Sequence, residues 1–84
     1  SMGHNVVFLK DGVNAVKFAN AAIDAKDTDY IPANYADSII AHTPMLGGGE
    51  KAIIEFTIDK PGSYVYLCSF PGHSSLMKGV LIVE

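Results

Sequence analysis

The sequence has 84 residues, a length that suits one domain and is too short for two, so we expect a single domain over residues 1–84. Hydrophobic residues make up 49% of the sequence and charged residues 18%, which excludes a solvated disordered chain and predicts a packed core. The formal net charge of −3 offers no basic field for phosphates, and no apolar stretch approaches the roughly 20 residues of a membrane-spanning helix, so we expect neither nucleic-acid binding nor a membrane span.

The first half of the sequence predicts one strand, one helix and a loop. Residues 4–9 form a short β-branched and aromatic run that ends at Asp11-Gly12, which predicts a strand followed by a turn. Residues 13–25 are rich in alanine and place apolar side chains at helical spacings, which predicts a short amphipathic helix. Residues 24–37 contain proline and asparagine breakers and are typical of a loop.

The second half predicts strands. Residues 38–42 form a brief apolar run, and residues 51–58 alternate between apolar and polar side chains more regularly than any other segment. Residues 60–63 are typical of a hairpin turn that leads into a strand over residues 64–68, and a final strand is expected over residues 79–83. Strands joined in this way predict an antiparallel sandwich or barrel.

Metal-ligating residue types gather in the loop between the last two predicted strands. Cys68, His73 and Met77 have the spacing C-x4-H-x3-M, and Cys68 is the single cysteine, so it has no partner for an internal disulfide. A thiolate, an imidazole and a thioether suit copper in both oxidation states. His4, in the first predicted strand, can supply a second imidazole, which would give a trigonal His2Cys group with Met77 as a weak axial ligand. This pattern predicts a blue (type 1) copper site.

Four segments carry a family resemblance: Gly3-His4-Asn5, Ile40-Ala41-His42-Thr43, Gly47 to Lys51, and Cys68-Ser69-Phe70-Pro71-Gly72-His73-Ser74-Ser75-Leu76-Met77-Lys78-Gly79. They resemble the corresponding segments of azurins, in the plastocyanin/azurin family, and the resemblance covers essentially the whole sequence. It implies an all-β, cupredoxin-like Greek-key sandwich with a short helix inserted in its first half. It also implies a protein that shuttles single electrons by Cu(I)/Cu(II) cycling in the periplasm or cell envelope, and that is not an enzyme.

The resemblance also implies a role for each residue of the site. His4, Cys68 and His73 would be equatorial copper ligands, Met77 the axial ligand, and the carbonyl of Gly3 would lie on the opposite axial side. Asn5 would hydrogen-bond across to the cysteine loop. Redox proteins would dock on an apolar patch around His73. The patch consists of Met2, Met45, Phe70, Pro71 and Leu76. The alternative is that these five residues only pack in the local core.

The sequence departs from azurins in two places. Val6 stands where azurins commonly have a core tryptophan, and the sequence has no tryptophan. The strands that precede the Gly-His-Asn segment in azurins are missing, so the sequence corresponds to the C-terminal portion that carries all the copper ligands. The final strand, residues 79–83, is apolar on both faces, as expected for a strand buried on two sides. We therefore expect that upstream strands of a longer polypeptide, or a second copy in an oligomer, close the sheet.

Other interpretations compete with this one. Taken alone, Cys68 is typical of a buried structural cysteine, or of a nucleophile paired with a histidine base. A tetrahedral zinc site could combine His4, His42, Cys68 and His73, although this leaves Met77 unused and the resemblance places His42 on the surface. The chain could also be a copper-binding carrier or sensor module. A further alternative is an engineered or trimmed azurin-like fragment, in which Ser1-Met2 would be left over from the engineering.

Overall fold

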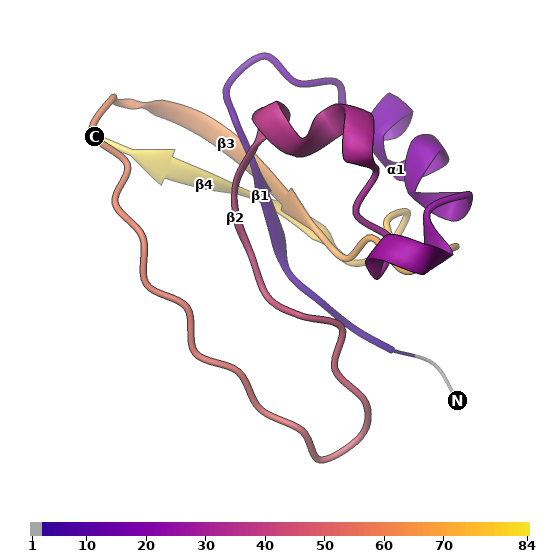
Figure 1. The fold of residues 1–84 in the computed structure, drawn as a ribbon. Coiled ribbons are helices and arrows are strands. Elements are labelled where there is room, and N and C mark those ends of the chain that lie inside the picture. The colour runs from indigo at the N-terminus through magenta and orange to yellow at the C-terminus, as the bar shows by residue number, and fades with distance from the viewer. Residues whose placement is uncertain (1–2) are drawn as a thin grey trace.

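The fold is built on a four-stranded antiparallel sheet. A computed structural model describes residues 3–84, and its strands have the order β2-β1-β3-β4 (Figure 1). The strands are β1 (Val7–Leu9), β2 (Ile39–His42), β3 (Gly62–Leu67) and β4 (Lys78–Val83). One α-helix, α1 (Ala15–Ile23), and two short 3-10 helices, η1 (Lys26–Thr28) and η2 (Ala33–Ser38), lie between β1 and β2 in the sequence.

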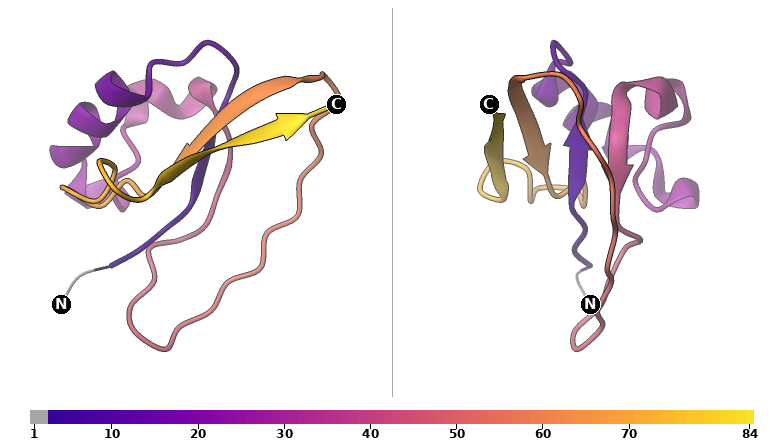
Figure 2. Two further views of the ribbon diagram at one scale, coloured as in Figure 1. Left: turned by 180° about the vertical axis from the view of Figure 1, so that it is seen from behind. Right: turned by 90° about the vertical axis from the view of Figure 1, so that its left-hand side faces the viewer.

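The hydrophobic core lies between α1 and one face of the sheet. Alternation along β1 places Val7 and Leu9 on this face, where they form a buried cluster with Phe18 of α1 and Leu67 of β3. The helix begins after Asn14, whose side chain accepts a hydrogen bond from the backbone N–H of Lys17 at 3.0 Å and so satisfies a free donor of the first turn. Figure 2 shows the helical segments gathered on one side of the sheet.

The other face of the sheet carries aromatic residues. Phe8 lies between Val7 and Leu9 and therefore points away from the helix, and its cross-strand partner Tyr66 lies beside it with ring centroids 5.5 Å apart. Phe56 contacts Phe8 from the extended segment that precedes β3, with ring centroids 4.8 Å apart. The long connection between β2 and β3 thus returns on the side of the sheet away from α1, where Figure 1 shows it as a wide loop.

Most of the predicted elements are confirmed, with bounds that differ by one to two residues at most ends. The predicted helix over residues 13–25 is α1, and the strands expected at residues 38–42, 64–68 and 79–83 correspond to β2, β3 and β4. The first strand is shorter than expected, because only Val7–Leu9 pair as a strand while His4 forms an isolated bridge with Leu46. The predicted loop over residues 24–37 was wrong in part, because it folds into η1 and η2.

The prediction of a strand over residues 51–58 was wrong for the part of the chain that the structure describes. These residues are extended but pair with no strand among residues 3–84, so residues 60–63 do not form a hairpin turn. Gly62 and Ser63 instead belong to β3. The alternation is still visible in the burial, because Ile54 and Ile58 are half-buried while their polar neighbours are exposed. Side-chain alternation specifies which face is apolar, whereas a strand also needs a partner for its backbone.

Residues 3–84 leave part of the final strand uncovered, so the cover expected for its two apolar faces stays a prediction about strands outside these residues. Val80 and Ile82 of β4 are 56% and 68% exposed, whereas Leu81 is half-buried. The reason is that β4 is an edge strand and that α1 does not extend over its outer residues. Among residues 3–84, no helix has the length and apolar character needed to cross a membrane.

Candidate metal centre

The two segments that carry the candidate ligands come from opposite ends of the sequence. His4 precedes β1 and is fixed by a bridge to Leu46, in which each residue donates its N–H to the other's carbonyl at 2.8 Å. Cys68 follows directly after β3 and is 2% exposed. Because β1 and β3 are paired, His4 and Cys68 lie at the same end of neighbouring strands. The sheet therefore brings together residues that are far apart in the sequence.

The loop between Cys68 and Met77 is closed by its own backbone hydrogen bonds. Cys68 donates its N–H to the carbonyl of Met77 at 3.0 Å, and Met77 donates to the carbonyl of His73 at 2.7 Å. His73 in turn donates to the carbonyl of Phe70 at 3.0 Å. Gly72 has a φ of +84°, a left-handed conformation that glycine adopts without a steric penalty and that lets the backbone turn sharply here. This geometry holds His73 and Met77 close to Cys68.

Asn5 ties the two segments together, as the resemblance implied. Its side-chain oxygen accepts a hydrogen bond from the backbone N–H of Ser69 at 2.7 Å, and its amide nitrogen donates to the Ser69 hydroxyl at 2.8 Å. Asn5 and Ser69 are 4% and 2% exposed, so both bonds are shielded from water. Buried polar groups need such partners, and no described residue has a buried side-chain polar atom without one. The residues adjacent to His4 and Cys68 are therefore locked to each other.

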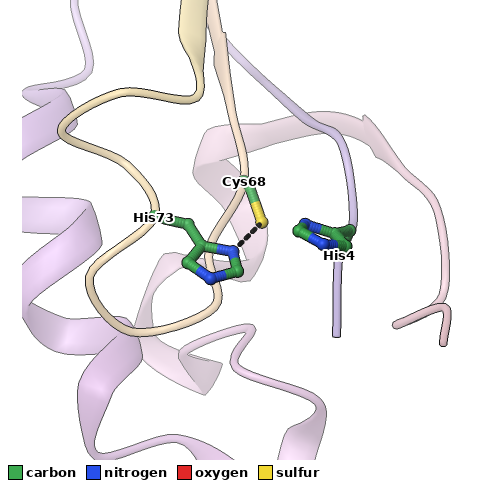
Figure 3. A group of neighbouring side chains, drawn as sticks. All are labelled: His4, Cys68 and His73. Atoms are coloured by element: carbon green, nitrogen blue, oxygen red, sulfur yellow. Dashed lines mark hydrogen bonds between the residues drawn. The ribbon is translucent and has the colours of Figure 1, made fainter. Parts of the chain in front are cut away.

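Potential ligand atoms of His4, Cys68 and His73 lie within 4.8 Å of one another. Figure 3 shows the two imidazoles on either side of the Cys68 thiol, which lies 3.5 Å from Nδ1 of His73. The two rings are nearly stacked, with centroids 4.9 Å apart and planes 26° apart. Zinc lies about 2.1 Å from nitrogen ligands and about 2.3 Å from sulfur ligands, so a metal with similar bond lengths keeps its donor atoms within about 4.4 Å of one another. The group therefore fits one metal ion after at most a small contraction.

The remaining predicted site residues occupy distinct places. Met77 is 41% exposed and lines the same pocket as Cys68. Gly3 lies against Met45, whose side-chain atoms would come within 3 Å of a Cβ at that position, so a larger residue would not fit without displacing Met45. His42 is exposed, with its Nδ1 2.8 Å from the carbonyl of Thr43, and does not belong to the ligand group. A zinc site that includes His42 is therefore wrong, and the predicted surface position of His42 is confirmed.

Two neighbours of the site were not predicted from the sequence. Leu46 fixes His4 by the backbone bridge, and Tyr30 contacts Phe70, which packs against His73. Both lie in segments without periodicity, and their contacts connect residues that are distant in the sequence. No local pattern could have indicated them. Among the residues of the expected apolar patch, Phe70 is confirmed as a neighbour of His73, while Met2 lies outside the described residues.

Comparison with known proteins agrees with this geometry. The family model described as copper binding proteins of the plastocyanin/azurin family matches residues 1–84. The chain belongs to this family. It is 45% identical over 85 residues to azurin-1 of Alcaligenes xylosoxydans xylosoxydans, covering 95% of this chain and 64% of the relative. It is 41% identical over 85 residues to outer membrane protein H.8 of Neisseria meningitidis, covering 94% of this chain and 43% of that protein.

A solved structure confirms the cupredoxin fold. The crystal structure of dithionite-reduced auracyanin from Roseiflexus castenholzii superposes with a TM-score of 0.87 at 43% identity, covering 100% of this chain and 68% of that one. The chain spans less than two thirds of the length of azurin-1 and of outer membrane protein H.8. Family membership and the group of two imidazoles and one thiol together identify the cofactor as copper, bound at one type 1 site. The alternative interpretation of Cys68 as a buried cysteine with only a structural role is therefore not supported.

Proposed function

We propose that this chain transfers single electrons as a type 1 blue copper protein. The observation that carries the proposal is the convergence of His4, Cys68 and His73 within 4.8 Å in a chain of the plastocyanin/azurin family. When bound, copper supplies a one-electron couple between Cu(II) and Cu(I). The chain supplies the donors and holds them in place, and the proposed reaction makes or breaks no bond, so the chain is not an enzyme in this proposal.

The proposed ligand set has three strong donors and weaker axial contacts. His4, Cys68 and His73 are the equatorial ligands, and the thioether of Met77 is the axial ligand. The backbone hydrogen bond from the N–H of Cys68 to the carbonyl of Met77 supports this role, because it holds Met77 close to Cys68. The carbonyl of Gly3 is proposed on the opposite axial side, where the close contact with Met45 limits how far this segment can shift.

The surroundings of the ligands suit electron transfer because they resist movement. An electron moves with a low barrier when the ligand geometry hardly changes between the two oxidation states. The paired hydrogen bonds between Asn5 and Ser69 and the closed loop from Cys68 to Met77 restrain the donors before any metal is bound. Similar hydrogen bonds around metal ligands commonly fix their orientation and tune the metal.

The proposed docking surface for a redox partner surrounds His73. Leu76, Phe70 and Pro71 belong to the loop between Cys68 and Met77; Leu76 is 90% exposed, and Phe70, Pro71 and Met45 are half-buried. His73 is itself half-buried, so its ring edge is the proposed contact through which the electron enters or leaves. A small apolar interface suits this role, because redox encounters commonly bury less than about 1,200 Å² and separate quickly. We propose that the chain works in the periplasm or cell envelope, as the name of its relative, outer membrane protein H.8, supports.

Additional strands are proposed to cover the surfaces that residues 3–84 leave open. Ile53, Val80 and Ile82 are 91%, 56% and 68% exposed, so two extended segments leave large apolar side chains open among the described residues. The segment over residues 51–58 and the outer edge of β4 both have unpaired backbone groups within the described residues. Strands of a longer polypeptide or of a second copy would pair with them and form one sandwich domain.

Titration with Cu(II), followed by visible absorption, tests the proposed function. A strong band near the red end of the spectrum is expected at one equivalent, because a short bond between Cu(II) and thiolate gives intense charge transfer. Cys68→Ser should abolish the band, and His4→Gln or His73→Gln should weaken or abolish it. His42→Gln is the matched control, because His42 is an exposed histidine outside the group, and it should leave the band unchanged. A folded chain that binds one Cu(II) without colour would refute the proposal.

A second measurement separates electron transfer from copper carriage. Rapid reversible reduction of the loaded chain by a redox protein, with copper retained, is expected for electron transfer. Passage of copper to an acceptor protein on the same timescale would instead identify the chain as a carrier.

A further inference from the structure

Tyr30 has an uncommon backbone conformation beside the metal loop. Asp29 and Tyr30 have φ values of 55° and 63°, and they are the non-glycine residues with positive φ in the described part of the chain. The left-handed conformation costs about 1–2 kcal/mol for a residue with a Cβ, and a bulky side chain adopts it less readily than aspartate does. Such strain persists only where surrounding contacts enforce it, and it is often found at functional sites. The position of Tyr30 therefore calls for a compensating interaction.

The backbone around Tyr30 is held by local hydrogen bonds. Tyr30 donates its N–H to the carbonyl of Ala25 at 2.8 Å, and Ile31 donates to the carbonyl of Thr28 at 3.0 Å. The Thr28 hydroxyl reaches the carbonyls of Ala25 and Ile31, at 3.1 and 2.7 Å. These bonds fix the path of the chain, so the side chain of Tyr30 leaves the turn in one direction.

That direction leads to the metal site through a row of aromatic rings. The Tyr30 ring meets the Phe70 ring edge to face, with centroids 5.3 Å apart and planes 62° apart. Phe70 packs against the imidazole of His73 with centroids 4.8 Å apart, and His73 lies 4.9 Å from His4. All three rings of the row from Tyr30 to His73 are half-buried. The row therefore connects a strained turn in the first half of the chain with a ligand near its end.

We propose that Tyr30 is a positioning residue for the metal site. Its ring holds Phe70 against His73, which limits rotation of the imidazole and keeps Nδ1 directed toward the Cys68 thiol, 3.5 Å away. Phe70 is half-buried and lies outside the buried core cluster, so the contact with Tyr30 is one of the few ring contacts that hold it. The expected effect on copper binding rests on the proposed function, whereas the ordering of the His73 imidazole does not. The ordering itself is a property of the metal-free chain.

The expected size of the effect follows from the contact. Edge-to-face aromatic pairs contribute about 0.5–1.5 kcal/mol, which corresponds to about a two- to thirteenfold change in an equilibrium constant. Removal of the Tyr30 ring should therefore shift the population of ordered His73 conformers by that factor. Copper should dissociate faster by a similar factor, because a mobile ligand leaves the metal more readily.

The test compares three variants of the chain by NMR without metal. Tyr30→Asn removes the ring but keeps a residue that tolerates the left-handed conformation. Tyr30→Phe keeps the ring, and Tyr35→Leu removes a ring that packs against Phe18 in the core, 5.4 Å away, instead of Phe70. Contacts between the Phe70 and His73 rings, and the order of the His73 imidazole, should be reduced in Tyr30→Asn and retained in the other two. If Tyr30→Asn does not fold, Tyr30→Gly takes its place, because glycine accepts positive φ without strain.

Two outcomes would overturn the proposal. One is an unchanged Phe70–His73 contact and unchanged imidazole order after loss of the Tyr30 ring. The other is an equal loss of order in Tyr35→Leu, which would mean that general destabilisation, rather than the ring contact, is responsible. Failure of the proposed electron-transfer function has a different signature, since a chain that stays colourless with Cu(II) would still show the ring ordering described here.

Discussion

Replacing Asn5 with alanine should destabilise the metal-free chain by about 2–4 kcal/mol. The change removes both hydrogen bonds to Ser69 and leaves a backbone N–H and a hydroxyl of that residue in a site that is 2% exposed. An unpaired buried polar group costs about 1–3 kcal/mol, and partial relaxation or entry of water lowers the sum for two such groups. Ser69→Ala removes only one of the two bonds and should cost about 1–2 kcal/mol.

Chemical denaturation of the metal-free protein measures these differences. The denaturation midpoint should be lowest for Asn5→Ala, intermediate for Ser69→Ala and highest for the native chain. The dependence of the unfolding free energy on denaturant concentration should be the same in all three. Ser75→Ala is the matched control, because the Ser75 hydroxyl is exposed and donates only to the carbonyl of Gly72 at 3.2 Å; it should change stability by less than about 0.5 kcal/mol. The double variant of Asn5 and Ser69 should cost less than the sum of the single ones, because they share a bond. A midpoint for Asn5→Ala within error of the native value would refute this account of how the ligand segments are joined.

Three further predictions concern the loop and the open surfaces. Met77→Leu should keep the blue colour and raise the reduction potential, because loss of a weak ligand and added hydrophobicity disfavour Cu(II); voltammetry that shows an unchanged or lower potential would remove the axial role of Met77. Gly72→Ala should cost about 1–2 kcal/mol in denaturation experiments, because alanine at a φ of +84° is strained, and an equally stable variant would mean that the turn relaxes freely. The isolated 84-residue chain should self-associate through its open edges unless further strands cover them, as light scattering with intact mass would show; a stable copper-loaded monomer of only these residues would contradict this expectation.

The sequence by itself determined the features that depend on short-range patterns or on the family resemblance. The spacing of Cys68, His73 and Met77 predicted a metal loop, because these residues lie in one turn whose geometry depends on its own residues, including Gly72. The need for a second imidazole pointed to His4, and the resemblance supplied the link through Asn5, which the hydrogen bonds between Asn5 and Ser69 confirm. The short helix was predictable for a similar reason, since periodic apolar residues over about two turns determine which face is buried.

Only the tertiary structure decided what depends on partners distant in the sequence. Residues 51–58 have the alternation of a strand, yet they remain unpaired among residues 3–84, because a strand requires backbone groups from another segment. The sequence likewise could not indicate that Leu46 would fix His4 or that Tyr30 would reach Phe70. Periodicity records the environment of a side chain along one segment, whereas the contact between two segments depends on the path of the whole chain between them.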